Sequence, residues 1–247
     1  MGGPKYRRAV AAEIEKAQNP EPGPTPTDDE PIFIEPRWPI ALALSFYIAI
    51  TVVLRVAEPH SETLGPRWLV PGIEISLLVA LIAANPAQLA GRARWLRPAS
   101  ITLISALAVV AMLSSAVLIV DLVTGSKVTQ SATSLLASGS LIWLGNALVF
   151  GLLYWELDSG GPLVRYRRER PYPDFAFSQQ LSPELAPSGW RPRYVDYLIL
   201  GVTTSTAFSP TDVMPMTAWA KLTMALQSLI SLTVIGLVIA RAVNVFT

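Results

Sequence analysis

The sequence predicts an all-α fold, a polytopic membrane helix bundle with about five transmembrane helices plus one re-entrant half-helix. Three observations predict this fold. Of the 247 residues, 51% are hydrophobic and only 15% are charged, whereas a soluble domain carries about 25% charged residues. The apolar residues gather in runs close to the length of about 20 residues that spans a bilayer as a helix. One further apolar run, 194–202, is too short to cross and leads into a Thr/Ser-rich turn.

The first 38 residues differ in composition from the rest of the chain. Residues 19–36 hold six prolines together with Asp28, Asp29 and Glu30. Such a stretch cannot bury enough apolar area to order itself. We therefore expect residues 1–38 to be a disordered Pro-rich N-terminal tail and residues 39–247 to form the transmembrane helical domain.

Four predicted spans precede the C-terminal segment. Their predicted boundaries are about 39–56, 68–85, 101–122 and 135–155. Two polar residues within them leave alternatives open. Glu74 either lies in the first turn of the second span, where the helix dipole favours a negative charge, or is a functional intramembrane carboxylate. Asn146 either hydrogen-bonds a neighbouring helix or takes part in transport.

The basic residues predict the orientation. With five spans and an inside N-terminus, residues 1–38, 85–100 and 156–193 are cytoplasmic. They hold five, three and six Lys or Arg, which makes fourteen against three in the opposite loops. This asymmetry predicts a multi-pass protein of the cell inner (plasma) membrane with a cytoplasmic N-terminus. The basic run 165–170 orients the chain or contacts anionic headgroups, and Tyr172, Phe175 and Phe177 are expected at the interface.

The segment 194–245 has the order of a re-entrant pore element: a half-helix, a polar loop and a full span. Irregular backbone at membrane depth is tolerated only where protein buries it or water lines it. The hydroxyl groups of this loop therefore form a candidate constriction. They belong to Thr203, Thr204, Thr206, Ser209 and Thr211.

The last span carries a polar stripe. Its members fall within roughly a 120° arc at 100° per residue; they are Thr217, Lys221, Gln227, Ser228 and Ser231. The stripe either lines a water path or packs on the re-entrant loop, whose polar groups need internal partners in lipid. Asp212 either faces water or is paired, because an unpaired carboxylate at membrane depth is costly. Lys221 is its nearest candidate partner in sequence.

Two resemblances follow from these motifs. The chain, most clearly in WELDSGGP, TAFSPTDVMPMTAWAK and ARAVN, resembles a bacterial family of uncharacterised integral membrane proteins. The stretch 203–244 resembles, in degenerate form, the pore loop and inner helix of potassium channels. Residues that fall on comparable positions are Thr206, Asp212, Pro215, Trp219 and Lys221.

The potassium-channel resemblance breaks at two points. No glycine occurs between Thr203 and Asp212, whereas a carbonyl filter uses glycines for backbone angles that other residues reach poorly. The basic residues also predict that this loop enters from the cytoplasm, opposite to a potassium channel. A hydroxyl-lined constriction is therefore expected in place of a carbonyl filter.

These observations predict channel-like permeation of a small ion, by a homo-oligomer because one such loop cannot enclose a pore. The alternative is a non-conducting membrane protein, with a structural, interaction or sensor role, that uses the loop as a packing element. No enzyme, cofactor or metal site is predicted, because the chain has no cysteine and one histidine. The expected partner is the lipid bilayer, and the net charge of +1 indicates no nucleic acid. The residues of the candidate pathway are Thr203, Thr204, Thr206, Ser209, Thr211, Asp212, Lys221, Gln227 and Ser231.

Overall fold

The computed structural model describes residues 38–57, 72, 75–76, 96–124, 132–166, 170–206 and 212–246. The chain divides into two units, Met1–Phe33 and Ile34–Thr247, and every described element belongs to the second. The predicted tail up to residue 37, Glu74 and nearly all of the second predicted span lie outside the described residues. Ser209 and Thr211 also lie outside them.

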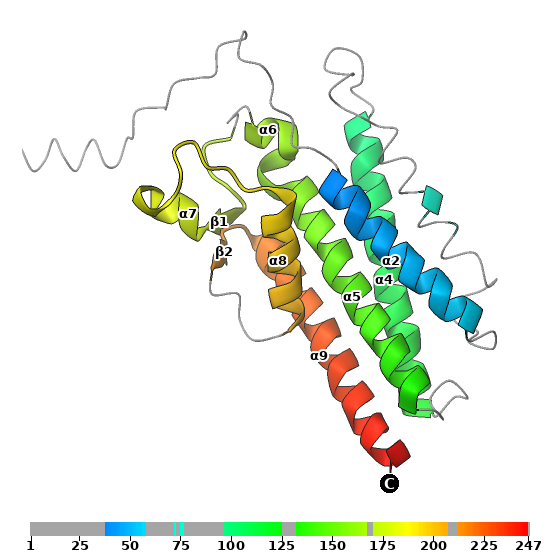
Figure 1. The fold of residues 1–247 in the computed structure, drawn as a ribbon. Coiled ribbons are helices and arrows are strands. Elements are labelled where there is room, and N and C mark those ends of the chain that lie inside the picture. The colour runs from blue at the N-terminus through cyan, green and yellow to red at the C-terminus, as the bar shows by residue number, and fades with distance from the viewer. Residues whose placement is uncertain are drawn as a thin grey trace, which may run out of the picture. The chain divides into compact units, whose positions relative to one another are not determined.

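The described part of the chain is mostly helical (Figure 1). Its longer helices are α2 (Trp38–Ala57), α4 (Leu96–Thr124), α5 (Ala132–Leu157), α8 (Tyr194–Ser205) and α9 (Ala218–Phe246). The predicted spans at 39–56, 101–122 and 135–155 coincide with α2, α4 and α5.

Three helical stretches among the described residues are long and apolar enough to cross a membrane. They are Ile104–Thr124, Leu135–Gly160 and Ala218–Asn244, in α4, at α5 and in α9. The apolar part of α2 is shorter, Trp38–Ala49. Such helices expose apolar side chains that only a lipid environment accommodates at this length. The protein is therefore a helical membrane-embedded protein.

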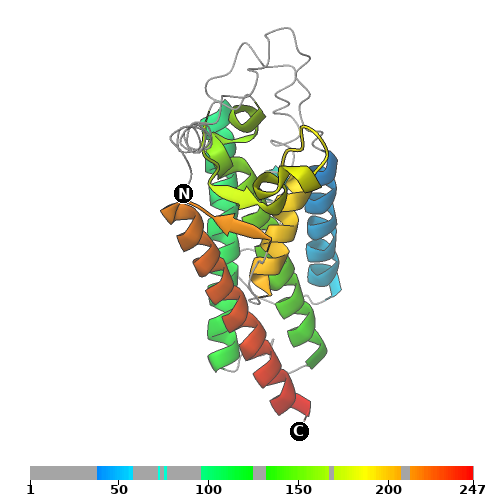
Figure 2. The same cartoon turned by 90° about the vertical axis from the view of Figure 1, so that its left-hand side faces the viewer.

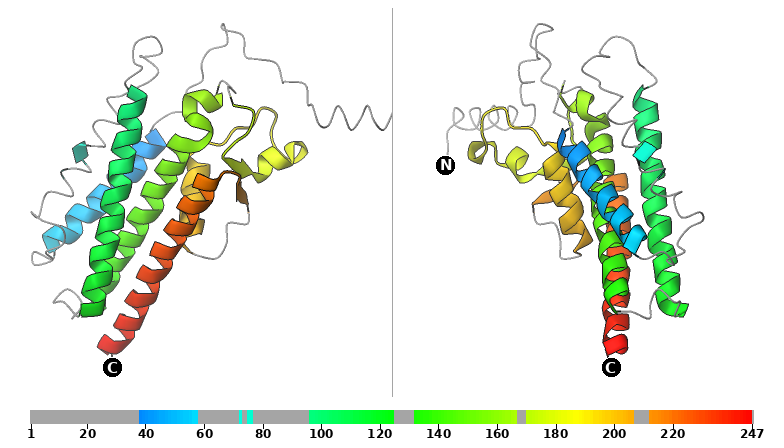
Figure 3. Two further views of the ribbon diagram at one scale, coloured as in Figure 1. Left: turned by 180° about the vertical axis from the view of Figure 1, so that it is seen from behind. Right: turned by 45° about the vertical axis from the view of Figure 1, so that its right-hand side comes forward.

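Helix α5 lies at the centre of the contacts, and both α8 and α9 run antiparallel to it (Figures 1 and 3). Along α8, Tyr197 lies against Gly151 and Ser205 lies near Trp143. Residue numbers therefore rise along α8 as they fall along α5. Helix α9 behaves in the same way, because Gln227 meets Tyr154 near its start while later residues meet earlier turns of α5.

Because α8 and α9 run in the same direction, the chain between them must return to the end where α8 begins. A two-stranded antiparallel ribbon lies at that end. It pairs β1 (Phe175–Phe177) with β2 (Val213–Pro215), and Phe177 lies opposite Val213. The ring of Phe177 also contacts Tyr197 in the first turn of α8, with 5.1 Å between centroids. The ribbon departs from the all-α prediction. It pairs two segments that lie far apart in sequence, and no local pattern predicts such a pairing.

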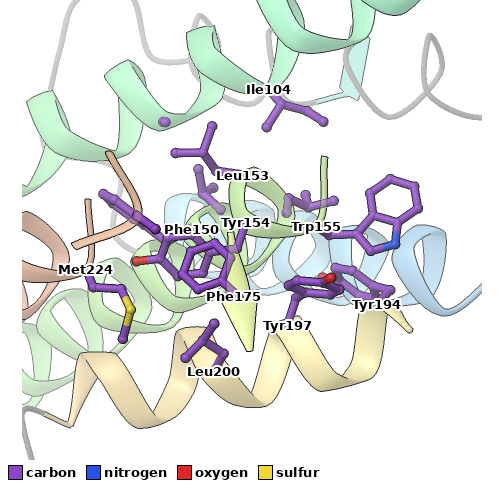
Figure 4. Packing of buried hydrophobic residues seen from close by; sticks show 14 of the residues in the cluster. Ile104, Phe150, Leu153, Tyr154, Trp155, Phe175, Tyr194, Tyr197, Leu200 and Met224 are labelled. Carbon is purple, nitrogen blue, oxygen red and sulfur yellow. The ribbon is translucent and has the colours of Figure 1, made fainter. Parts of the chain in front are cut away.

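The main core gathers aromatic side chains at the C-terminal end of α5 (Figure 4). Phe175 lies 5.0 Å from Tyr154 and 5.5 Å from Trp219 between ring centroids. Phe175 and Phe177 were expected at the membrane interface, and the structure corrects this, because both are buried between the ribbon and the helices. Of the three aromatics expected there, Tyr172 is exposed.

Two glycines allow α8 to lie directly against α5. A Cβ on Gly201 would overlap the main-chain oxygen of Ala147 and would lie 3.0 Å from the main-chain nitrogen of Gly151. A Cβ on Gly151 would lie 3.0 Å from the main-chain oxygen of Tyr197. Small residues at such crossings let helix backbones approach closely. The half-helix is therefore held against α5 by backbone contact.

Candidate functional site

The centre of the candidate site is Gln227 on α9, whose side chain is fully buried where α5, α8 and α9 meet. Its Oε1 accepts a hydrogen bond from the Tyr154 hydroxyl on α5 at 2.6 Å. Its Nε2 donates to the main-chain oxygen of Gly201 and to the Ser205 hydroxyl on α8, both at 2.8 Å. An amide offers one acceptor oxygen and two donors. Gln227 therefore uses both donors and its acceptor oxygen to join the three helices.

Further hydrogen bonds extend this α5–α8–α9 joint toward the middle of the helices. The Asn146 Nδ2 donates to the Ser231 hydroxyl at 2.7 Å, between α5 and α9. The Ser228 hydroxyl donates to the main-chain oxygen of Thr204 at 3.2 Å, between α9 and α8. The indole of Trp143 donates to the main-chain oxygen of Ser205 at 3.1 Å. Of the two alternatives for Asn146, these contacts support the hydrogen bond to a neighbouring helix.

Three polar residues predicted on one stripe of α9 thus point into the helix packing. Gln227 and Ser231 are buried and Ser228 is half-buried, and each bonds α5 or α8. Among the described residues, two buried oxygen atoms of the joint have no hydrogen-bond partner, the Asn146 Oδ1 and the Thr204 Oγ1. Lys221 belongs to the same sequence stripe but is exposed.

Two of the three threonines at the end of α8 bond their own helix. The half-buried Thr203 hydroxyl donates to two main-chain oxygens of the preceding turn, at 2.9 and 3.1 Å. The half-buried Thr206 hydroxyl donates to the main-chain oxygen of Thr203 at 2.7 Å. Thr204 faces the joint. The structure therefore places these three neighbours in different surroundings rather than along one described path.

Asp212, directly before β2, and Lys221, in the first turn of α9, both have exposed side chains. The main-chain oxygen of Asp212 accepts from the Ser178 N–H at 3.1 Å, which ties the ribbon to the following segment. The proposed pairing of the Asp212 carboxylate with the Lys221 ammonium stays a prediction.

A second polar group closes the C-terminal end of α5, and its centre is Asp158. This residue is fully buried in the short 3₁₀ helix η3 (Asp158–Gly160). Its Oδ1 accepts from the main-chain N–H groups of Asp174 and Phe175 at 2.9 and 3.2 Å and from the Ser159 hydroxyl at 3.0 Å. Its Oδ2 accepts from the Tyr197 hydroxyl. Burial raises the pKa of Tyr197 well above its ordinary value, so this hydroxyl stays protonated and donates.

Asp174 makes the reciprocal bond, and we call the pair Asp158 and Asp174 the carboxylate clasp. Asp174 is also buried, and its Oδ2 accepts from the main-chain N–H of Ser159 at 2.8 Å. Its Oδ1 accepts from the indole of Trp219 in the first turn of α9 at 3.0 Å. Each aspartate thus binds main-chain N–H groups beside the other, and the clasp joins the end of α5 to β1, α8 and α9.

Arg165 also stabilises the turn that follows α5. It lies in the short helix α6 (Pro162–Tyr166), and its Nη1 donates to the main-chain oxygens of Trp155 and Asp158 at 2.7 and 2.8 Å. Its guanidinium carbon lies 5.0 Å from the centroid of the Tyr197 ring, a cation–π distance. Ser159 within this turn has φ 53°, a left-handed conformation that only few non-glycine residues adopt.

The sequence-based prediction missed the carboxylate clasp. Asp158 and Asp174 are 16 positions apart, and no periodic pattern links them. One available signal was an acidic residue directly at a helix end, followed by two glycines. Within the described ranges, no group of three or more His, Cys, Asp or Glu side chains could hold a metal ion.

No protein-family model matches this chain, and no curated protein or solved structure is significantly similar to it. The resemblances to a bacterial membrane protein family and to the potassium-channel pore therefore stay predictions.

Proposed function

We propose that this chain is a non-conducting multi-pass membrane protein in which α8 is a re-entrant half-helix, used as a packing wedge between α5 and α9. The observation that carries the proposal is Gln227, which bonds both neighbouring helices with its two amide hydrogens and its oxygen. A residue of an open water path would instead present polar atoms to water.

The chemistry of the bilayer explains why such a wedge needs a polar joint. A half-helix that ends at membrane depth leaves main-chain carbonyls without helical partners, and lipid supplies no hydrogen-bond donors. The donors here come from α5 and α9. The Trp143 indole bonds the main-chain oxygen of Ser205 and the Ser228 hydroxyl bonds that of Thr204, both in the last turn of α8. Gln227 adds a bond to the main-chain oxygen of Gly201, one turn earlier. The last turns of α8 are thereby stabilised without water.

The carboxylate clasp supports the same proposal at the surface end. It fixes the start of α8 and the start of α9 to the end of α5 through Tyr197, Trp219 and the two aspartates. Helix α8 is thus held at its start by the clasp and at its end by the joint. This arrangement is suited to hold the surface segment 170–193 in a fixed position. The function class is then a structural, interaction or sensor role.

The test measures stability and ion flux on one pair of variants of the reconstituted full chain. Gln227→Leu removes the joint, and Thr233→Val is the matched control, because the Thr233 hydroxyl bonds only the preceding turn of α9. We expect Gln227→Leu to have a lower melting temperature than the wild type and Thr233→Val to have an unchanged one. Neither variant should show ion flux. An unchanged melting temperature together with altered flux in Gln227→Leu would contradict the proposal.

Channel-like permeation by a homo-oligomer is the second candidate. It is supported by the order half-helix, loop and long helix, and by the half-buried Thr203 and Thr206 beside the loop 207–211. Oligomeric state separates the two candidates. A symmetric oligomer in nanodiscs that conducts ions would favour this second candidate, whereas a monomer in detergent and in bilayers argues against a pore.

A further inference from the structure

Large apolar side chains are exposed on the surface element that follows α5. They lie before β1, on β2 and its end, in α7 (Ser178–Leu181) and in the 3₁₀ helix η4 (Pro183–Leu185). We call them the interface patch; its members are Tyr172, Leu181, Leu185, Met214 and Met216, exposed by 83%, 55%, 85%, 56% and 56%. This element has a well-packed underside, because Phe175 and Phe177 are buried. Exposure of its other large apolar residues therefore requires an explanation.

The element lies beside the helices, at the level where α9 begins. Figure 2 shows α7 in front of α8, and Figure 1 shows the same helix displaced to the side of the bundle. Hydrogen bonds fix this level. The Ser178 N–H at the start of α7 donates to the Asp212 main-chain oxygen at 3.1 Å, and the Met216 N–H donates to the Asp174 main-chain oxygen at 2.8 Å. The apolar span of α9 starts directly after, at Ala218.

The exposed charges of the same element are balanced. Of its described charged residues, Arg170 and Arg193 are exposed and Arg191 is half-buried, and two exposed acids, Glu184 and Asp212, oppose them. Asp174 belongs to the buried clasp. A surface that combines exposed Leu, Met and Tyr with charged side chains fits the headgroup region of a bilayer, where apolar side chains enter and arginines meet phosphate groups.

We propose that the interface patch inserts into the headgroup layer of the same bilayer that α5 and α9 cross. Leu181 and Leu185, the exposed leucines of α7 and η4, enter the boundary between headgroups and acyl chains, a depth of about 5–10 Å. The arginines lie among lipid phosphates. The element thus lies on the membrane surface beside the start of α8. This proposal does not depend on whether the chain conducts ions.

Single-cysteine labelling tests the proposal directly, because the chain has no cysteine of its own. An environment-sensitive fluorophore is attached at Leu185→Cys or Leu181→Cys in the full chain, reconstituted in phosphatidylcholine vesicles with and without phosphatidylglycerol. Glu184→Cys is the matched control, because it is exposed on the same turn but charged. Lipids that carry a nitroxide near the headgroup or deep in the acyl chain report depth, and iodide reports contact with water.

We expect blue-shifted emission at Leu181 and Leu185, with stronger quenching by the shallow nitroxide lipid than by the deep one and protection from iodide. The label at Glu184 should be quenched by iodide. Arg193→Gln should reduce the gain in shallow quenching that phosphatidylglycerol brings. Quenching at Leu185 by iodide alone would overturn the proposal, and so would protection from both iodide and nitroxide lipids, which would mean that a protein covers the patch.

Discussion

The Tyr154 hydroxyl on α5 donates to the Gln227 side-chain oxygen on α9, 73 residues later, at 2.6 Å. Both residues are fully buried. Gln227 can accept this bond while it donates to α8, because its oxygen and nitrogen point to opposite neighbours. The single side chain of Gln227 therefore links α9 to both α5 and α8.

A double-mutant cycle measures this pair. Tyr154→Phe and Gln227→Leu should each destabilise the fold, and the double variant should lose less than the sum of the two. We predict a coupling free energy of about 0.5–1.5 kcal/mol, the range of hydrogen bonds between membrane helices. Strictly additive losses in denaturant titrations would show that the hydrogen bond contributes nothing.

The contact between Gly201 and α5 leaves no room for a side chain. Gly201→Ala should destabilise the protein by about 1–3 kcal/mol, because its Cβ would overlap the main-chain oxygen of Ala147. Gly236→Ala on α9 is the control, since nothing lies within 4 Å of its Cβ position. In a helix interior that change should be neutral or stabilise by up to about 1 kcal/mol. Equal melting temperatures for the two variants would argue against close packing of α8.

The Asp158 carboxylate accepts hydrogen bonds from four donors. Asp158→Asn replaces one acceptor oxygen by an NH₂ group, which faces donors on the main chain or on Tyr197. We predict a loss of about 1–3 kcal/mol and faster proteolysis within 178–193, because the clasp holds that segment. Glu184→Gln, an exposed acid in the same segment, should leave both quantities unchanged.

The Lys/Arg asymmetry predicts the orientation, and an impermeant thiol reagent on intact cells can check this prediction. Ser159 lies beside the basic run but is buried, so the exposed Ser188 is the better reporter. Ser188→Cys should stay unlabelled until the membrane is permeabilised, because this segment is predicted to face the cytoplasm. Labelling before permeabilisation would show that this segment faces outward and would contradict the predicted topology.

Apolar run length was enough to predict three of the described helices. The described helices at 38–57, 96–124 and 132–157 match the predicted spans to within a few residues, because the bilayer fixes both length and composition. The 100° periodicity also placed Gln227, Ser228 and Ser231 on one face of α9. Lys221 lies on the same face but near the start of α9, where its long side chain reaches the exposed surface.

The partners of these residues could not be predicted, because they depend on contacts between distant segments. Nothing local links Asp158 to Asp174 or Phe177 to Val213. The close approach of Gly201 to Gly151 likewise depends on the crossing of two helices. The expectation that Phe175 and Phe177 lie at the interface was wrong because aromatic residues beside a basic run also suit a buried ribbon.

Ion flux through proteoliposomes tests the central proposal most directly. Purified wild-type chain is reconstituted at increasing protein-to-lipid ratios, and flux is followed under potassium and sodium gradients, with Asp212→Asn and Lys221→Met alongside. We predict flux equal to that of protein-free vesicles at every ratio and in each variant, because the polar groups of α9 bond α5 and α8. Flux that rises with the amount of wild-type protein and changes in Asp212→Asn would contradict the packing role and establish the pore.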